Sequence, residues 1–186
     1  MKILMIGDSH SVTTFPLISK YLKSKGHTIT DTISNIGWAV YSYTKNPESI
    51  LVALEKNPDA VIVSLGGNNN YTNSKYGEKV YEFLDLIGHP RRKVVWISPY
   101  YATRQDVQGR HEWTFDWLSK NLPRDIPLIN VMKYQPKIYD DGVHYPKSSH
   151  EYILEEVNPK IHSALKSTLK KVLLLSAILS TAIALI

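Results

Sequence analysis

The sequence contains no cysteine, so disulfides, thiolate nucleophiles and cysteine-based metal sites are excluded. Low-complexity tracts and internal repeats are also absent. The 186 residues, of which 43% are hydrophobic and 21% charged, are typical of one folded domain rather than of a disordered chain.

The chain has no concentrated patch of one charge, although its formal net charge is +5. Lysines are scattered, and the only basic clusters lie at residues 91–93 and 166–171. This distribution argues against a nucleic-acid partner. The phosphate-binding pattern Gly-x-x-x-x-Gly-Lys is missing too, which argues against a nucleotide-binding domain.

The first residues are not expected to act as a secretory signal, because Gly7 interrupts the first apolar run far short of the length that such signals need. Residues 172–186, by contrast, contain no charge, glycine or proline. A helix that is apolar on all sides lies deep in a protein or in lipid, and a small domain has little interior left to surround one. We therefore predict that residues 169–186 form a hydrophobic helix that anchors a domain of residues 1–168 to a membrane.

The alternative for this tail is a helix that packs against the domain or a partner subunit. Fifteen apolar residues cover about 22 Å of a hydrocarbon core about 30 Å thick, so the anchor would need Lys170 and Lys171 to reach toward the headgroups. These lysines predict a domain on the cytoplasmic side, or a membrane-containing virion as its location. The small residues Ser176, Ser180 and Ala184 allow a homo-oligomer through this helix.

Apolar runs alternate with helix-like stretches, an order typical of an α/β sandwich with a parallel sheet. Strands are predicted at residues 2–6, 27–33, 60–65, 93–98 and 126–131. Helices are predicted at residues 13–25, 47–56, 76–87, 113–121 and 147–169, the last one bent or broken near Pro159, and residues 100–110 are predicted to form a polar loop.

Glycine-bearing polar turns follow the first three predicted strands. They are Gly7-Asp8-Ser9, Asn35-Ile36-Gly37 and Gly66-Gly67-Asn68-Asn69. Ligands bind beyond the carboxyl ends of the strands in open parallel sheets, so these turns are predicted to share one functional edge.

The turn at Ser9 has the form that a nucleophilic serine needs, between a strand and a helix start. The alternative is that Ser9 only caps the helix. A serine hydroxyl is usually activated by a histidine whose other ring nitrogen is held by a carboxylate. Asp141-Gly142-Val143-His144 offers both, whereas His10 is a rival by adjacency only. Ser9, His144 and Asp141 are therefore the predicted nucleophile, base and orienting acid.

An oxyanion hole needs donors placed where negative charge develops. The amides of Ser9 and Gly37 and the side-chain amide of Asn68 are the candidates, although Asn68 alone would be read as a turn residue.

In this order, the four blocks make the chain resemble the SGNH hydrolases, also called GDSL-like esterases and lipases, over most of residues 1–168. The resemblance implies a flavodoxin-like three-layer α/β/α sandwich with a five-stranded parallel sheet, and ester hydrolysis through an acyl-serine. It implies no metal and no organic cofactor. Two departures stand out, because the usual Gly-Asp-Ser-Leu reads Gly-Asp-Ser-His and the usual Gly-x-Asn-Asp reads Gly-Gly-Asn-Asn.

The predicted substrate is an ester with a short acyl group, such as an O-acetyl group on a glycan, because few residues are spare for a lid or a deep acyl tunnel. Asn69, Tyr100 and Arg104 are the predicted substrate contacts. A membrane anchor would suit a lysophospholipid instead. The rival from another class is a catalytically idle SGNH-like module used for binding or assembly.

Overall fold

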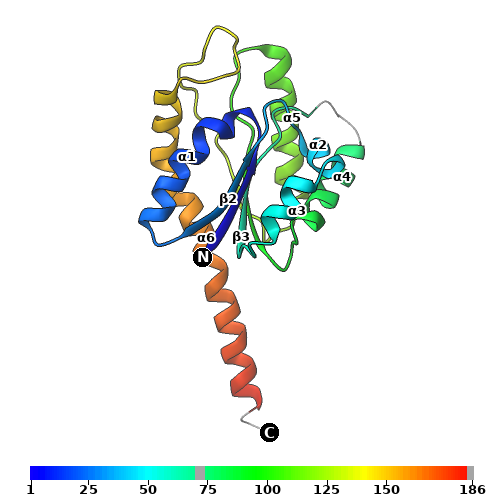
Figure 1. Cartoon of the computed structure of the whole chain (residues 1–186), viewed down its shortest axis with the longest axis vertical. Coiled ribbons are helices and arrows are strands. Elements are labelled where there is room, and N and C mark those ends of the chain that lie inside the picture. The colour runs from blue at the N-terminus through cyan, green and yellow to red at the C-terminus, as the bar shows by residue number, and fades with distance from the viewer. Residues whose placement is uncertain (70–73, 184–186) are drawn as a thin grey trace.

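The protein folds as three layers, with a sheet between two layers of helices (Figure 1). The computed structural model describes residues 1–69 and 74–183, and the side chains within them except those of residues 74 and 168–183. The five strands are β1 (Lys2–Gly7), β2 (Thr28–Ser34), β3 (Ala60–Ser64), β4 (Lys93–Ile97) and β5 (Leu128–Ile129). They are all parallel, in the order β2-β1-β3-β4-β5. The predicted five-stranded parallel sheet is confirmed, and this strand order is the flavodoxin-like one.

The middle of the sheet is apolar on both faces because helices cover both. On β1, Ile3 and Met5 face one core, whereas Leu4 and Ile6 face the other. The first core is closed by α1 (Ser9–Ser24) and α6 (Lys147–Ile183). The second is closed by α2 (Val40–Lys45), α3 (Glu48–Leu54), α4 (Ser74–Leu86) and α5 (Gln105–Asn121), which lie together on the opposite side of the sheet (Figure 1).

The pairing of β1 with β3 sets the position of the functional edge. Gly7 lies opposite Ser64 in the parallel register, so both strands end at the same level. The Asp8 amide donates to the Ser64 carbonyl oxygen at 3.2 Å and continues this alignment by one residue. The turns that carry Ser9 and Asn68 therefore start side by side.

Two helices begin earlier than the sequence predicts. The helix predicted from residue 13 begins at Ser9, because the Asp8 side chain caps it by accepting a hydrogen bond from the His10 amide at 3.1 Å. The predicted polar loop at 100–110 is wrong in its second half, because α5 starts at Gln105. Its first two turns are polar on the exposed side and bury only Val107 and His111, four residues apart.

The last helix also differs from its prediction. No break occurs at Pro159, and α6 runs as one helix from Lys147 to Ile183. The predicted apolar segment 169–186 falls on residues whose side chains, and from 184 onward whose whole placement, lie outside the described part of the chain. Within the described part, no helix is long and apolar enough to cross a membrane. The membrane anchor, the boundary at residue 168 and the location therefore stay predictions.

Candidate active site

Ser9 is the first residue of α1 and follows β1 after only one connecting residue. The connection is tight, because a Cβ atom on Gly7 would lie 2.4 Å from the Ser11 Cβ. Only glycine fits this close approach. The Ser9 hydroxyl thus lies at a helix N-terminus, where unpaired amides favour negative charge.

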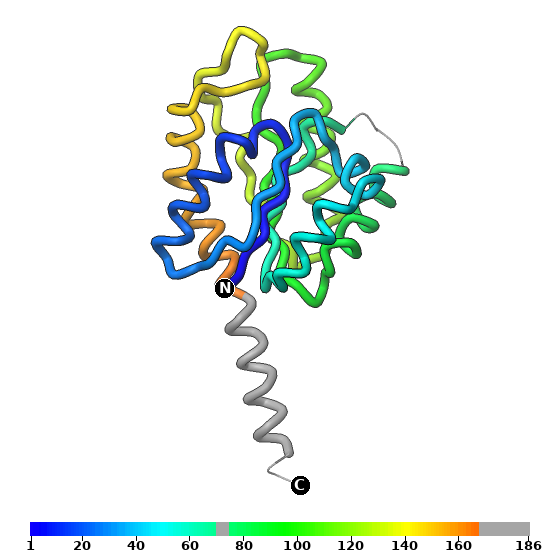
Figure 2. The backbone as a smooth tube through the Cα atoms, viewed as in Figure 1, coloured from blue at the N-terminus to red at the C-terminus, as the bar shows by residue number. Residues whose placement is uncertain are grey.

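His144 and Asp141 meet Ser9 from the other end of the domain. The segment before α6 lies beside the start of α1 (Figure 2), and the His144 Nε2 atom is 3.3 Å from the Ser9 Oγ atom. The His144 Nδ1 atom is 2.7 Å from the Asp141 Oδ2 atom. The structure therefore brings the three predicted triad residues into one hydrogen-bonded chain.

A tight turn fixes the Asp141 carboxylate. Its Oδ1 atom accepts the amides of Val143 at 2.8 Å and His144 at 2.9 Å, and Gly142 sits at a φ of 70°. These two amide hydrogen bonds and the His144 ring lower the pKa of Asp141 to about 2, although about half of its side chain is exposed. An ionised carboxylate only accepts, so the Nδ1 atom of His144 carries the hydrogen and its Nε2 atom is left to accept from Ser9.

The candidate oxyanion donors Ser9, Gly37 and Asn68 lie in three turns, which follow β1, β2 and β3. The Asn68 side chain lines the cavity beside Ser9, and its Nδ2 atom donates to the Trp38 carbonyl oxygen at 3.2 Å. The side-chain amide carries a second N–H group, which is the proposed donor to a ligand. Gly37, at a φ of 77°, lies in the turn just before Trp38. It does not line the cavity, so the turn of Gly37 contacts the site through Asn68.

Of the three predicted substrate contacts, only Arg104 lines the cavity. Its guanidinium group also pairs with Asp106 through two hydrogen bonds of 2.8 and 3.0 Å. The Asn69 side chain is buried and donates to the Gly66 carbonyl oxygen at 3.2 Å. Tyr100 is buried as well and stacks on His10, with ring centroids 4.4 Å apart.

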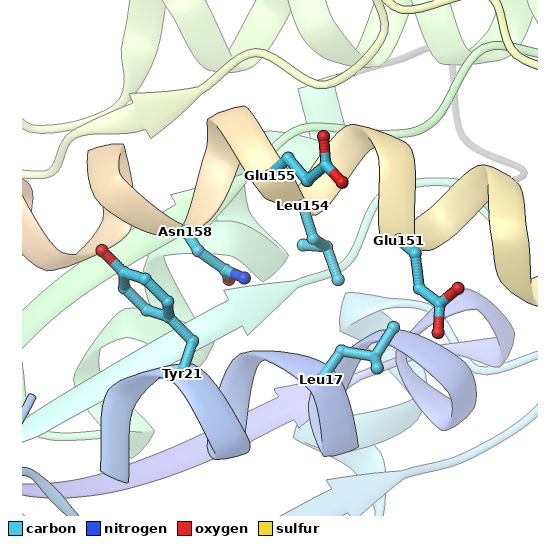
Figure 3. Close-up of a pocket in the computed structure, with 6 residues that line it drawn as sticks. All are labelled: Leu17, Tyr21, Glu151, Leu154, Glu155 and Asn158. Atoms are coloured by element: carbon cyan, nitrogen blue, oxygen red, sulfur yellow. The ribbon is translucent and has the colours of Figure 1, made fainter. Parts of the chain in front are cut away.

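The cavity beside Ser9 is small, with a volume of about 130 Å³. Sites for drug-sized ligands are usually about 300–1,000 Å³. A larger groove of about 490 Å³ lies between α1 and α6 (Figure 3), but none of the predicted catalytic residues lines it. In residues 1–69 and 74–183, no group of three or more His, Cys, Asp or Glu side chains is arranged to hold a metal ion.

Sequence reasoning did not assign a role to three residues that line this cavity, Asp8, His10 and His111. All three are buried. Burial raises the pKa of Asp8 to about 7 and holds the pKa of His10 well below its usual value. Their depth depends on how α5 and α6 pack, which no local pattern reveals. The one available signal was the spacing of Val107 and His111 on a helix face.

The chain resembles known proteins in its structure and not in its sequence. No family model and no curated protein sequence matches the chain. Solved structures do match, including TesA, at 16% identity and a TM-score of 0.68 over 88% of this chain and 99% of TesA. AlinE4, described as an SGNH-hydrolase family esterase, aligns at 17% identity and a TM-score of 0.57 over 89% of this chain and 97% of AlinE4. The chain has the SGNH hydrolase fold.

A third SGNH-like match is a catalytic mutant of Axe2, an acetylxylan esterase from Geobacillus stearothermophilus. It aligns at 14% identity and a TM-score of 0.62, over 84% of this chain and 93% of Axe2. The alignments cover 93 to 99% of each of these three solved chains, so this chain contains nearly all of their fold. At such low identity they establish the SGNH fold, and the chemistry has to be argued from the residues of this chain.

Proposed function

We propose that the protein is a serine ester hydrolase that works through an acyl-Ser9 intermediate. The observation that carries this proposal is the hydrogen-bonded chain from the Ser9 Oγ atom through His144 to Asp141, with distances of 3.3 and 2.7 Å. A serine activated by a histidine, which is oriented in turn by a carboxylate, is the arrangement used for acyl transfer on several unrelated folds.

In the first half-reaction, the Ser9 oxygen attacks the ester carbonyl carbon while the Nε2 atom of His144 takes the hydroxyl proton. The tetrahedral intermediate collapses, the bond to the alcohol breaks, and His144 returns the proton to the leaving alcohol oxygen. In the second half-reaction, water attacks the acyl-Ser9 ester, His144 takes a proton from the water, and Ser9 leaves with that proton. Asp141 stays ionised throughout and stabilises the imidazolium.

The negative oxygen of each tetrahedral intermediate is assigned to two donors, the Ser9 amide and the Asn68 side chain, because Gly37, the third predicted donor, does not line the cavity. The Ser9 amide gains from its place at the N-terminus of α1. The Asn68 side chain is held at the cavity by its hydrogen bond to the Trp38 carbonyl oxygen. Removing one such donor typically costs about 10² to 10³ in kcat.

The proposed substrates carry short acyl groups, and an O-acetyl group on a glycan is the first choice. The 130 Å³ cavity holds about four water volumes, enough for an acetyl group but not for a long chain. The likeness to an acetylxylan esterase supports the same choice. A lysophospholipid remains the second candidate, and it is favoured by the apolar residues 172–186.

The test compares wild-type protein with Ser9→Ala and His144→Ala on three substrates: p-nitrophenyl acetate, acetylated xylan and a lysophospholipid. We expect turnover of the acetyl esters and a fall of at least about 10³-fold in each variant, with an unchanged circular dichroism spectrum. Ser119→Ala, on the exposed side of α5, is the matched control.

A fluorophosphonate probe gives a second measurement that does not depend on the substrate. It should label Ser9 in the wild type and fail to label Ser9→Ala. A folded wild-type protein that neither reacts with the probe nor hydrolyses any of the esters is an idle binding module. Activity on the lysophospholipid alone would replace the acetyl-ester proposal.

A further inference from the structure

His111 is a buried polar residue on α5 whose ring joins two segments near the site. Only 2% of its surface is exposed. Its Nδ1 atom lies 2.6 Å from the Tyr100 carbonyl oxygen, in the segment that follows β4, and its Nε2 atom lies 3.1 Å from the Gly67 carbonyl oxygen, in the turn that follows β3. The imidazole therefore bridges the loops of two neighbouring strands.

The Gly67 backbone lies against Asp8 on its other side. Burial, the largest effect, raises the pKa of Asp8, whereas the backbone groups of His10 and Gly67 lower it. The space between the two partners is filled, because a Cβ atom on Gly67 would lie 3.2 Å from the His111 Nε2 atom and 3.5 Å from the Asp8 Oδ2 atom. Gly67 thus lies between Asp8, in the turn after β1, and His111, on α5.

We propose that His111 is a positioning residue, whose Nε2–H group donates to the Gly67 carbonyl and so fixes the turn that presents Asn68 to the oxyanion. This inference rests on the proposed function, because it gives Asn68 a role in catalysis. Asn68 is the next residue after Gly67, so a rotation of the Gly67 peptide changes the position of the Asn68 side chain directly. A misplacement of about 1 Å can cost about 10²-fold in rate.

The identity of the two acceptors makes the hydrogen on Nε2 necessary. Both are carbonyl oxygens, which do not donate, so a bare Nε2 atom would set two lone pairs against each other at 3.1 Å. The ring satisfies both carbonyls at once only as the imidazolium, with a hydrogen on each nitrogen. Burial and the neighbouring Arg110 lower the pKa of His111 by more than the hydrogen bonds to Tyr100 and Gly67 raise it, so the bridge to Gly67 in the neutral ring needs the tautomer with its hydrogen on Nε2.

The experiment uses two amide side chains that each mimic one half of the ring. Gln can place its amide nitrogen near the position of Nε2, whereas Asn reaches only the position of Nδ1. His111→Gln should therefore keep the bond to Gly67 and retain kcat to within about threefold. His111→Asn should lower kcat by about 10- to 100-fold with KM changed less than twofold, because the loss falls on the oxyanion donor.

Two further measurements separate this inference from the esterase proposal and from simple destabilisation. Hydrogen exchange at the amides of Gly67 and Asn68 should speed up at least tenfold in His111→Asn but not in His111→Gln, and ¹⁵N NMR of the wild type should show a hydrogen on Nε2. If the wild type hydrolyses no ester, the proposed function fails, while these two readings still test the bridge. Equal exchange and equal kcat in the two variants would overturn the bridge. A bare Nε2 atom in the wild type would overturn it as well, and that reading is available even where His111→Asn does not fold.

Discussion

The two flanks of Ser9 and the distant turn at residues 141–144 contain the same residue types in opposite environments. Asp8 and His10 adjoin Ser9 in the sequence, yet both are buried, and within the described residues the two ring nitrogens of His10 have no hydrogen-bond partner. Asp141 and His144 are half exposed and hydrogen-bonded to each other. The pKa of Asp8 is raised to about 7, whereas that of Asp141 is lowered to about 2. Surroundings, not adjacency, decide which aspartate and histidine can serve the serine.

The largest effect is expected at Asp141, where we predict that kcat depends on the negative charge of the carboxylate. Asp141→Asn keeps an oxygen for the two amides of the turn but points an N–H group at the Nδ1 atom of His144. The ring then takes the tautomer with a hydrogen on Nε2 and cannot accept from Ser9. We expect kcat on p-nitrophenyl acetate to fall by about 10² to 10⁴-fold. Asp140→Asn, one residue earlier and exposed, is the control, and an equal loss there would break the comparison.

The next effect concerns stability and arises at Asp8. A carboxyl group whose folded-state pKa is about 7 and whose unfolded pKa is about 3.8 binds its proton more tightly when folded, so stability falls as pH rises from about 4 to about 7. Asp8→Asn should remove this slope and raise the free energy of unfolding at pH 8 by about 2 to 4 kcal/mol.

Urea unfolding of Asp8→Asn at pH 5 and pH 8 measures this slope, with the exposed Asp85→Asn as control. The asparagine keeps an oxygen that can accept the His10 amide, so the cap of α1 should survive. A wild-type protein whose stability does not fall between these pH values would show that Asp8 is ionised at little cost.

The smallest of the three effects is expected at His10. Its pKa is held below the ordinary value by burial first and then by His150, His144 and His111, while Asp141 raises it. The contribution of neutral His10 to stability is therefore fully present above about pH 6.5. It is lost as the pH falls, because His10 then binds a proton in the unfolded chain but not in the folded one. The free energy of unfolding of His10→Leu minus that of the wild type should be about 2 kcal/mol larger at pH 5 than at pH 8. Thermal melts at the two pH values measure this gain, and an identical difference at both would contradict the buried, neutral state.

Most of the fold could be predicted from the sequence, because its strands are short apolar runs between glycine-bearing turns. Residues 60–65 illustrate this, since every residue of β3 is buried. The triad geometry could be anticipated because Asp141 and His144 are local to one turn around Gly142. The position of Asn68 beside Ser9 followed from the parallel sheet, whose strand ends share one edge.

The remaining features depend on tertiary packing that a local pattern does not contain. The start of α5 at Gln105 was missed because its first turns are polar and only Val107 and His111 are buried. Tyr100 was taken as a wall of the site, but it lies beneath it, in contact with His10 and Tyr145. Both errors come from treating polar and aromatic residues near a site as exposed, whereas Tyr100 packs on His10 of α1 and His111 bridges two loops.

Ser9 and His144, the proposed nucleophile and base, are separated by 135 residues in the sequence. A ribosome-bound chain therefore holds Ser9 from the start of synthesis but acquires the imidazole of His144 only after all five strands and helices α1 to α5 have been made. No shorter N-terminal fragment can assemble the pair, and contacts so distant in sequence form late and slowly. A half-made chain therefore lacks the proposed catalytic pair because of the topology alone.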